Sequence, residues 1–194
     1  MSTIEQAVKV LQRDGIVVYP TETVYGLGAD ALSEDAVMRI YEAKGRPLGK
    51  PISIAVSDEE MLRAVAVVDG EAEAFIRRFL PGPVTVVLPA KSCLPELLTG
   101  GTGLIGIRMP AHETALRIIE ALDAPITATS ANLADEAPVT RPEDVDVAYD
   151  ILVDGGELPG TPSTVVDLTT RTILRKGKAW EDVEAYLRGQ GESA

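Results

Sequence analysis

Short apolar segments rich in β-branched residues recur along the first two-thirds of this chain, and amphipathic stretches of helical length separate them. The strand-like segments are residues 16–19, 52–56, 84–88, 104–108 and 125–129. Continuous apolar runs of this length are typical of buried strands, and strands that alternate with helices are typical of α/β domains. The pattern therefore predicts an α/β fold with a twisted mixed sheet flanked by helices.

Capping residues and turn residues mark the helices between these strands. Ser2 or Thr3 can cap a first helix that ends at residues 14–15, and Ser33 can cap a second helix that stops near Gly45. Further helices are expected at residues 61–65, 71–80, 112–122 and 180–187, and further strands at 151–153, 164–167 and 172–175. Because no repeat or linker interrupts the pattern, we expect one domain over residues 1–194.

Charge and residue counts exclude several classes of protein. With 30 acidic and 18 basic residues the net charge is -12, which argues against a broad nucleic-acid-binding face and suggests a salt-adapted surface. Cys93 and His112 are single residues of their kinds, so disulfides, zinc clusters and HExxH sites are excluded. Without a signal-like start or a membrane-length apolar run, the sequence predicts a cytoplasmic protein with no membrane contact.

Two windows of this acidic chain carry cations and no acid, namely residues 44–57 and 169–180. In the first, glycines and prolines interleave with Lys44, Arg46 and Lys50. Such a loop could present backbone amides and cations to a polyphosphate, or it could be a solvated basic face.

Polar residues follow the apolar strands. Arg108 ends one strand, where it could bind a ligand carboxylate or form a structural ion pair. Residues 127–132 end another with hydroxyl and amide side chains, suited to a ligand or to an ordinary turn. Residues 21–28, with two hydroxyl side chains and two glycines, follow the first strand. In open α/β sheets ligands bind at this carboxyl end of the strands.

Taken together, these segments resemble the YrdC/Sua5 family, the threonylcarbamoyl-AMP synthases. The resemblance rests on six motifs in the family's order, at residues 19–32, 44–52, 81–90, 106–112, 128–132 and 163–177. It implies a YrdC-like twisted mixed sheet with a concave, positively charged groove, and the short single-domain form. The implied activity converts L-threonine, bicarbonate and ATP into threonylcarbamoyl-AMP and pyrophosphate, for t6A37 modification of tRNA by downstream transfer proteins.

The resemblance also implies roles for particular residues. Thr23, Arg108, Ala128 and Ser163 match L-threonine-binding positions. The positions matching the ATP site are Lys44, Arg46, Lys50, Ser130, Asn132 and Arg175. The chemistry needs no covalent nucleophile, and Mg²⁺ is expected through the ATP phosphates rather than a protein metal site.

Four positions depart from the family's pattern, namely Ala55, Pro162, Asp135 and Lys176. A histidine that approaches threonine often stands where Ala55 is, and the other three departures bear on the nucleotide loops. Two other interpretations remain open. One is a non-catalytic RNA-binding or ribosome-associated member, and the other is a relative that uses carbamoyl phosphate, a type usually found in longer zinc-containing chains.

Overall fold

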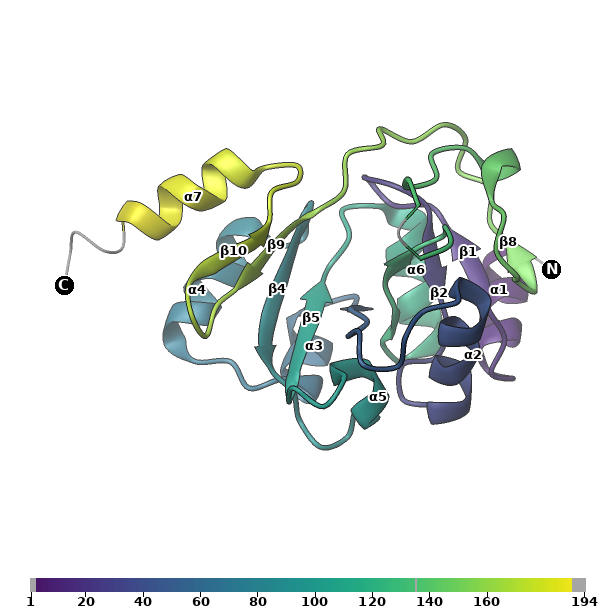
Figure 1. The fold of residues 1–194 in the computed structure, drawn as a ribbon, viewed down its shortest axis with the longest axis horizontal. Coiled ribbons are helices and arrows are strands. Elements are labelled where there is room, and N and C mark those ends of the chain that lie inside the picture. Colours follow the sequence, from purple (N-terminus) through teal and green to yellow (C-terminus); the bar gives the residue numbers. More distant parts are fainter. Residues whose placement is uncertain (1–2, 135, 190–194) are drawn as a thin grey trace.

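Two mixed β-sheets with helices packed on them make up the molecule (Figure 1). The computed structural model describes residues 3–134 and 136–189. Four strands form the first sheet in the order β7-β2-β1-β8: β1 (Val17–Tyr19), β2 (Gly26–Gly28), β7 (Thr129–Ser130) and β8 (Ile151–Leu152). Six form the second in the order β10-β9-β4-β5-β3-β6: β3 (Ile54–Ala55), β4 (Val84–Pro89), β5 (Leu104–Arg108), β6 (Ile126–Thr127), β9 (Thr164–Asp167) and β10 (Thr172–Arg175).

The mixed α/β class predicted from the sequence is confirmed, but the strands are shared between two sheets instead of one. The predicted strand at residues 125–129 explains the difference. Its first half, β6, pairs with β3 of the six-stranded sheet, whereas its second half, β7, pairs with β2 of the four-stranded sheet. Ala128 lies between them, and its amide donates to the carbonyl of Ser53. One short segment thus joins the two sheets.

All but one of the helices in the described residues lie close to their predicted positions. The helices are α1 (Thr3–Leu11), α2 (Glu34–Lys44), α3 (Glu59–Val65), α4 (Gly70–Phe79), α5 (Glu96–Thr99), α6 (Glu113–Leu122) and α7 (Trp180–Gly189), with a 3₁₀ turn at Pro142–Asp144. Ser33 Oγ caps α2 by accepting from the Ala36 amide, and Gly45 ends it in the left-handed conformation at φ 57°. Ser2, the other candidate cap of α1, lies outside the described residues.

Strand β2 and helix α5 were not predicted. Strand β2 has the sequence Gly-Leu-Gly, and glycine is depleted in strands, so composition gives no strand signal there. It forms because it pairs with β1 on one side and β7 on the other. Helix α5 is one turn of four residues, shorter than a periodic pattern can reveal.

Two clusters of buried apolar side chains hold the layers together. The larger one joins the helices α2 and α4 to both sheets and includes Val18, Ile40, Phe75 and Ile107. The smaller one packs α1 and α6 against β1, β3 and β6. In Figure 1, α4 and α7 lie beside β9 and β10, whereas α1 and α2 lie beside β1 and β2.

Candidate functional site

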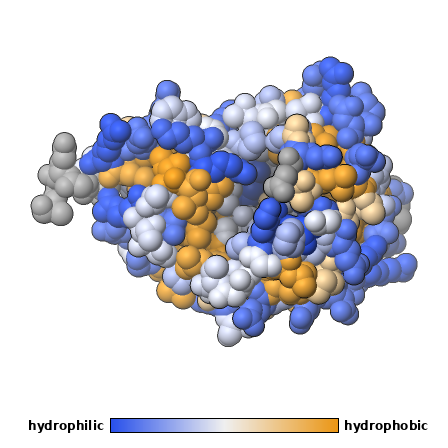
Figure 2. Space-filling view, in the orientation of Figure 1, coloured by the Kyte–Doolittle hydropathy of each residue, from blue (hydrophilic) through white to orange (hydrophobic). Residues whose placement is uncertain are grey.

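A cavity of about 210 Å³ lies between the two sheets, and both contribute to its walls. Tyr19, Gly26 and Ser130 line it from the four-stranded sheet, and Arg108 and Arg175 from the six-stranded sheet. Figure 2 shows this face of the molecule hollowed near its centre, among hydrophilic atoms. The segment that crosses between the sheets, at Ala128, forms part of the same wall.

Three arginines give this cavity its charge. Arg46, Arg108 and Arg175 line it, whereas its lining within the described residues includes no aspartate or glutamate. Burial lowers the pKa of Arg175, and the nearby charge of Arg108 lowers it further. Since the guanidinium groups of Arg108 and Arg175 repel each other, an anionic ligand between them is favoured.

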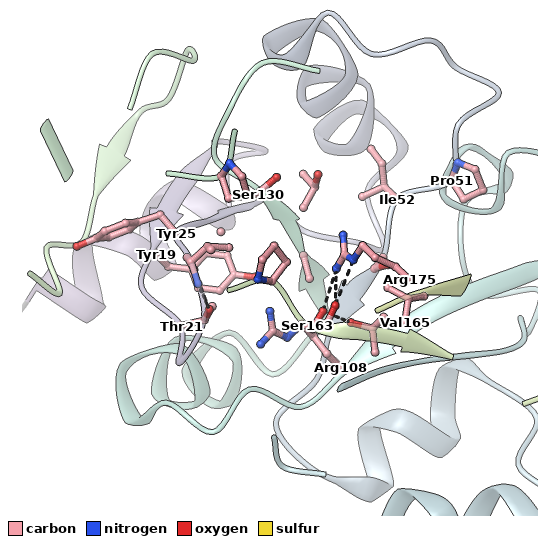
Figure 3. A pocket seen from close by; sticks show the side chains of 18 of the residues that line it. Tyr19, Thr21, Tyr25, Pro51, Ile52, Arg108, Ser130, Ser163, Val165 and Arg175 are labelled. Atoms are coloured by element: carbon pink, nitrogen blue, oxygen red, sulfur yellow. Dashed lines mark hydrogen bonds between the residues drawn. The ribbon is translucent and has the colours of Figure 1, made fainter. Parts of the chain in front are cut away.

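Arg175 is held in place by Ser163 (Figure 3). Its Nε and Nη2 donate to the Ser163 carbonyl oxygen at 3.1 and 2.9 Å, and Nη2 also reaches Ser163 Oγ at 3.1 Å. Ser163 Oγ shares a further hydrogen bond of 2.8 Å with Thr85 Oγ1. These contacts tie β4 and β10 to the residue that precedes β9 at the cavity wall, so the guanidinium is preorganised for a ligand.

Arg108 is the most buried of the three arginines, and its partners come from the loop after β1. Its Nη2 forms an ion pair with Glu22 Oε1 at 2.7 Å, and its Nη1 donates to Thr23 Oγ1 at 3.2 Å. Tyr19 lies nearby, and burial raises the pKa of its hydroxyl while the Arg108 charge opposes that shift. The structural ion pair that the sequence left open for Arg108 is therefore present, and Arg108 still faces the cavity.

Comparison with known proteins identifies the family. The model of the Sua5/YciO/YrdC family, described as telomere recombination, matches residues 9–177. The chain belongs to the Sua5/YciO/YrdC family.

Several relatives of this chain are named threonylcarbamoyl-AMP synthase. A threonylcarbamoyl-AMP synthase of Pyrococcus abyssi is 46% identical over 174 residues, and one of Bacillus subtilis is 41% identical over 196 residues. The alignments cover 85% and 95% of this chain but 51% and 56% of those proteins, so the chain spans about half their length. A synthase of Xanthomonas campestris is 36% identical, with 89% of this chain and 96% of that protein covered.

Solved structures of the family share the fold. P. abyssi Sua5 complexed with L-threonine superposes with a TM-score of 0.88 at 43% identity, covering 93% of this chain and 56% of that one. Escherichia coli YciO superposes with a TM-score of 0.81 at 29% identity, covering 90% and 89%. Both agree with the mixed α/β fold and its two sheets.

Six of the ten site residues expected from the family resemblance line the cavity. They are Arg46, Arg108, Ala128, Ser130, Ser163 and Arg175. Thr23 does not line the cavity; it is fully buried, and its Oγ1 accepts a hydrogen bond from Arg108. Lys50 is exposed and stands outside the lining. The structure thus brings together residues from the loop after α2, from the link between β6 and β7, from the residue before β9, and from the strands β5, β7 and β10.

Lys44 and Asn132 support the cavity wall from behind. The Lys44 ammonium is buried and donates to the carbonyl oxygens of Ser130 and Asn132. Burial lowers the pKa of Lys44 to about 8, and the charge of Arg46 contributes. Asn132 Nδ2 donates to the carbonyls of Leu133 and Glu136, which shapes the turn after β7. Neither side chain is part of the cavity lining.

The four departures from the family's pattern fall in different surroundings. Ala55 is buried in β3 and pairs in register with Arg108. Pro162 lines the cavity beside Ser163. Lys176 stacks its ammonium on the Trp180 ring at 3.8 Å and pairs with Glu184 at 3.6 Å, away from the cavity. Asp135 lies outside the described residues.

Several residues of the site escaped sequence reasoning. Thr21, Ser53 and Thr85 line the cavity with hydroxyl groups, and Glu22 pairs with Arg108. Thr21 and Glu22 belong to the polar segment after the first strand, so a signal was present. Nothing in the sequence links Glu22 to Arg108, because 86 residues separate them.

Among the described residues, no helix is long and apolar enough to cross a membrane. Nor does the described part of the chain gather three or more histidine, cysteine, aspartate or glutamate side chains that could hold a metal ion.

Proposed function

We propose that this chain is an L-threonylcarbamoyladenylate synthase, a nucleotidyltransferase that acts on L-threonine, bicarbonate and ATP. The supporting observation is the cavity between the sheets, where three arginines and several hydroxyl groups converge and no carboxylate of the described residues lines the wall. A site of this kind suits ligands that carry a carboxylate and several phosphates. The names of the relatives and the threonine complex of P. abyssi Sua5 agree with it.

Threonine is assigned to the Arg108 side of the cavity. The guanidinium of Arg108 binds its carboxylate, Ser163 and the backbone at Ala128 complete the subsite, and Thr23 orients Arg108 from behind. The side chain of Arg108 is 9% exposed, so its charge is weakly screened by solvent.

ATP is assigned to the wall formed by Arg46, Ser130 and Arg175. Arg46 is fixed by donating from Nε to the Lys50 carbonyl and from Nη2 to the Pro51 carbonyl, at 3.2 and 2.7 Å. Lys50, exposed next to the lining residue Pro51, adds positive charge beside this wall. Lys44 and Asn132 hold the β7 turn in position. Mg²⁺ arrives bound to ATP, since the described lining offers no carboxylate ligand.

The reaction has two steps. The deprotonated threonine amine attacks bicarbonate, and a carbamate and water result. A carbamate oxygen then attacks the α-phosphorus of ATP, and the bond to pyrophosphate breaks. The arginines align the reactants and offset negative charge, which supplies most of the rate enhancement in phosphoryl chemistry. The product would pass to other proteins that modify adenosine 37 of tRNA.

An RNA-binding role without catalysis is the alternative. The net charge of -12 disfavours it, because a long RNA would extend beyond a cavity of this size and be repelled by the excess of acidic residues in the chain.

Pyrophosphate release separates these two functions. Purified protein is incubated with ATP, Mg²⁺ and bicarbonate, with and without L-threonine. We expect release that depends on threonine and on bicarbonate. Pyrophosphate release that does not depend on threonine would contradict the synthase. So would the absence of release together with RNA binding at physiological salt.

A further inference from the structure

The ion pair between Arg108 and Glu22 leaves hydrogen-bonding capacity unused on both partners. Arg108 uses Nη2 for Glu22 Oε1 and Nη1 for Thr23 Oγ1. Within the described residues, Arg108 Nε and Glu22 Oε2 are buried and have no hydrogen-bond partner. Buried polar atoms are normally paired in folded proteins, so two orphaned atoms in one ion pair indicate that a further group belongs here.

Because the Arg108–Glu22 ion pair is buried, solvent screens its charges weakly, and both charges act on a ligand bound nearby. The side chain of Arg108 is 9% exposed and that of Glu22 is 15% exposed. Arg108 lines the cavity and Glu22 does not. A ligand that binds Arg108 therefore contacts a guanidinium that is already paired with one carboxylate. Charges at this depth interact more strongly than charges on the surface.

A second carboxylate on the same guanidinium would be repelled by Glu22. A free amino acid carries an ammonium on the carbon next to its carboxylate, and this positive charge offsets the repulsion. A hydroxy acid of the same shape has no such charge. Arg175, a second cation near Arg108, attracts the carboxylate of the amino acid and that of the hydroxy acid alike. It therefore does not favour the ligand that carries the ammonium.

We propose that Glu22 is a specificity-determining residue, which makes the Arg108 subsite select a zwitterionic α-amino acid over a carboxylate that lacks the α-ammonium. This inference rests on the proposed function for the choice of threonine as ligand. It adds that selection occurs at binding, before carbamate formation. Glu22 acts through its charge and through its hold on Arg108.

Calorimetric titration tests the proposal with two ligands, L-threonine and the 2,3-dihydroxybutyrate of matching configuration, whose hydroxyl replaces the ammonium. Wild-type protein should bind threonine more tightly. In Glu22→Gln the ratio of the two dissociation constants should fall about tenfold, the effect of one charge at a partly buried site. Glu22→Asp keeps the charge and should retain most of the ratio.

Glu157→Gln is the matched control, because Glu157 pairs with Arg141 at 3.1 Å on the surface. Its ratio should equal that of the wild type. An unchanged ratio in a folded Glu22→Gln protein would overturn the proposal. If that variant does not fold, the wild type decides, since equal affinity for both ligands, or binding of neither, overturns it as well.

Binding is measured without turnover, so the two proposals fail separately. A protein that selects threonine through Glu22 but releases no pyrophosphate contradicts the synthase alone. A threonine-dependent synthase whose Glu22→Gln variant keeps the wild-type ratio contradicts the role of Glu22 alone.

Discussion

The side-chain nitrogen of Lys44 lies 2.5 Å from the carbonyl oxygen of Ser130, 86 residues further along the chain. It donates to the carbonyl of Asn132 as well, so the last residue of α2 fixes the turn that follows β7. A lysine that the family resemblance assigns to the ATP site thus points into the protein, where it contacts the backbone of two other residues.

Burial of this lysine predicts a pH dependence of stability. The pKa of Lys44 is lowered to about 8 in the folded protein, whereas an unfolded lysine titrates at about 10.4. Between these values the unfolded chain binds the extra proton, so the free energy of unfolding rises with pH. Urea unfolding at pH 7.5 and pH 10 should show this rise for wild type relative to Lys44→Met. An equal response of both proteins would contradict it.

Breaking the buried ion pair should destabilise the fold. Arg108→Ala leaves the Glu22 carboxylate buried without its counter-ion, which costs about 3 kcal/mol. The double variant Arg108→Ala/Glu22→Gln removes that charge and should recover a large part of the loss. Urea unfolding of the wild type, the single variant and the double variant checks this. Equal losses in the single and double variants would show that the unpaired charge is not the cause.

The shape of the Arg108 side chain should matter for threonine. Arg108→Lys keeps the positive charge but loses the planar fork that binds Glu22, Thr23 and a ligand carboxylate together. The apparent KM for threonine should rise about tenfold while that for ATP stays close to wild type. Pyrophosphate release at varied threonine measures both. A wild-type threonine dependence would remove Arg108 from its assigned role.

Two cations of one loop should differ in their effect on ATP. Arg46 lines the cavity and is fixed by two backbone carbonyls, whereas Lys50 is exposed and lies outside the lining. Arg46→Ala should weaken MgATP binding about tenfold or more, and Lys50→Ala by a smaller factor. Isothermal titration of the two variants compares them directly. A larger effect at Lys50 would place the phosphates outside the cavity.

Close packing of Gly26 against Tyr19 predicts a steric effect. A Cβ at Gly26 would lie 2.7 Å from Tyr19 Cζ, so Gly26→Ala must displace this buried ring, at a loss of about 1–3 kcal/mol. Gly70→Ala is the control: its Cβ would meet nothing within 4 Å, and it should be neutral or stabilising by up to about 1 kcal/mol. Urea unfolding measures both, and equal stabilities would show that Tyr19 moves freely.

Much of the fold could be predicted because its signals are local. Strand β5 has the predicted bounds, since an apolar run ends there at a charged residue. Ser33 and Gly45 define α2 through a side-chain cap and a left-handed turn. Strand β2 and the division of residues 125–129 between two sheets could not be predicted, because both depend on which strands lie beside them.

The sequence by itself determined the family, the order of most helices and strands, and a set of cations and hydroxyl residues suited to phosphates and a carboxylate. Tertiary structure alone decided which of them face the cavity. Arg46, Arg108 and Arg175 line it, Lys44 is turned inward, and Glu22 shares the guanidinium of Arg108. Caps and hydrophobic periodicity are set by neighbouring residues, whereas these pairings join residues 86 positions apart, which strand order and register bring together.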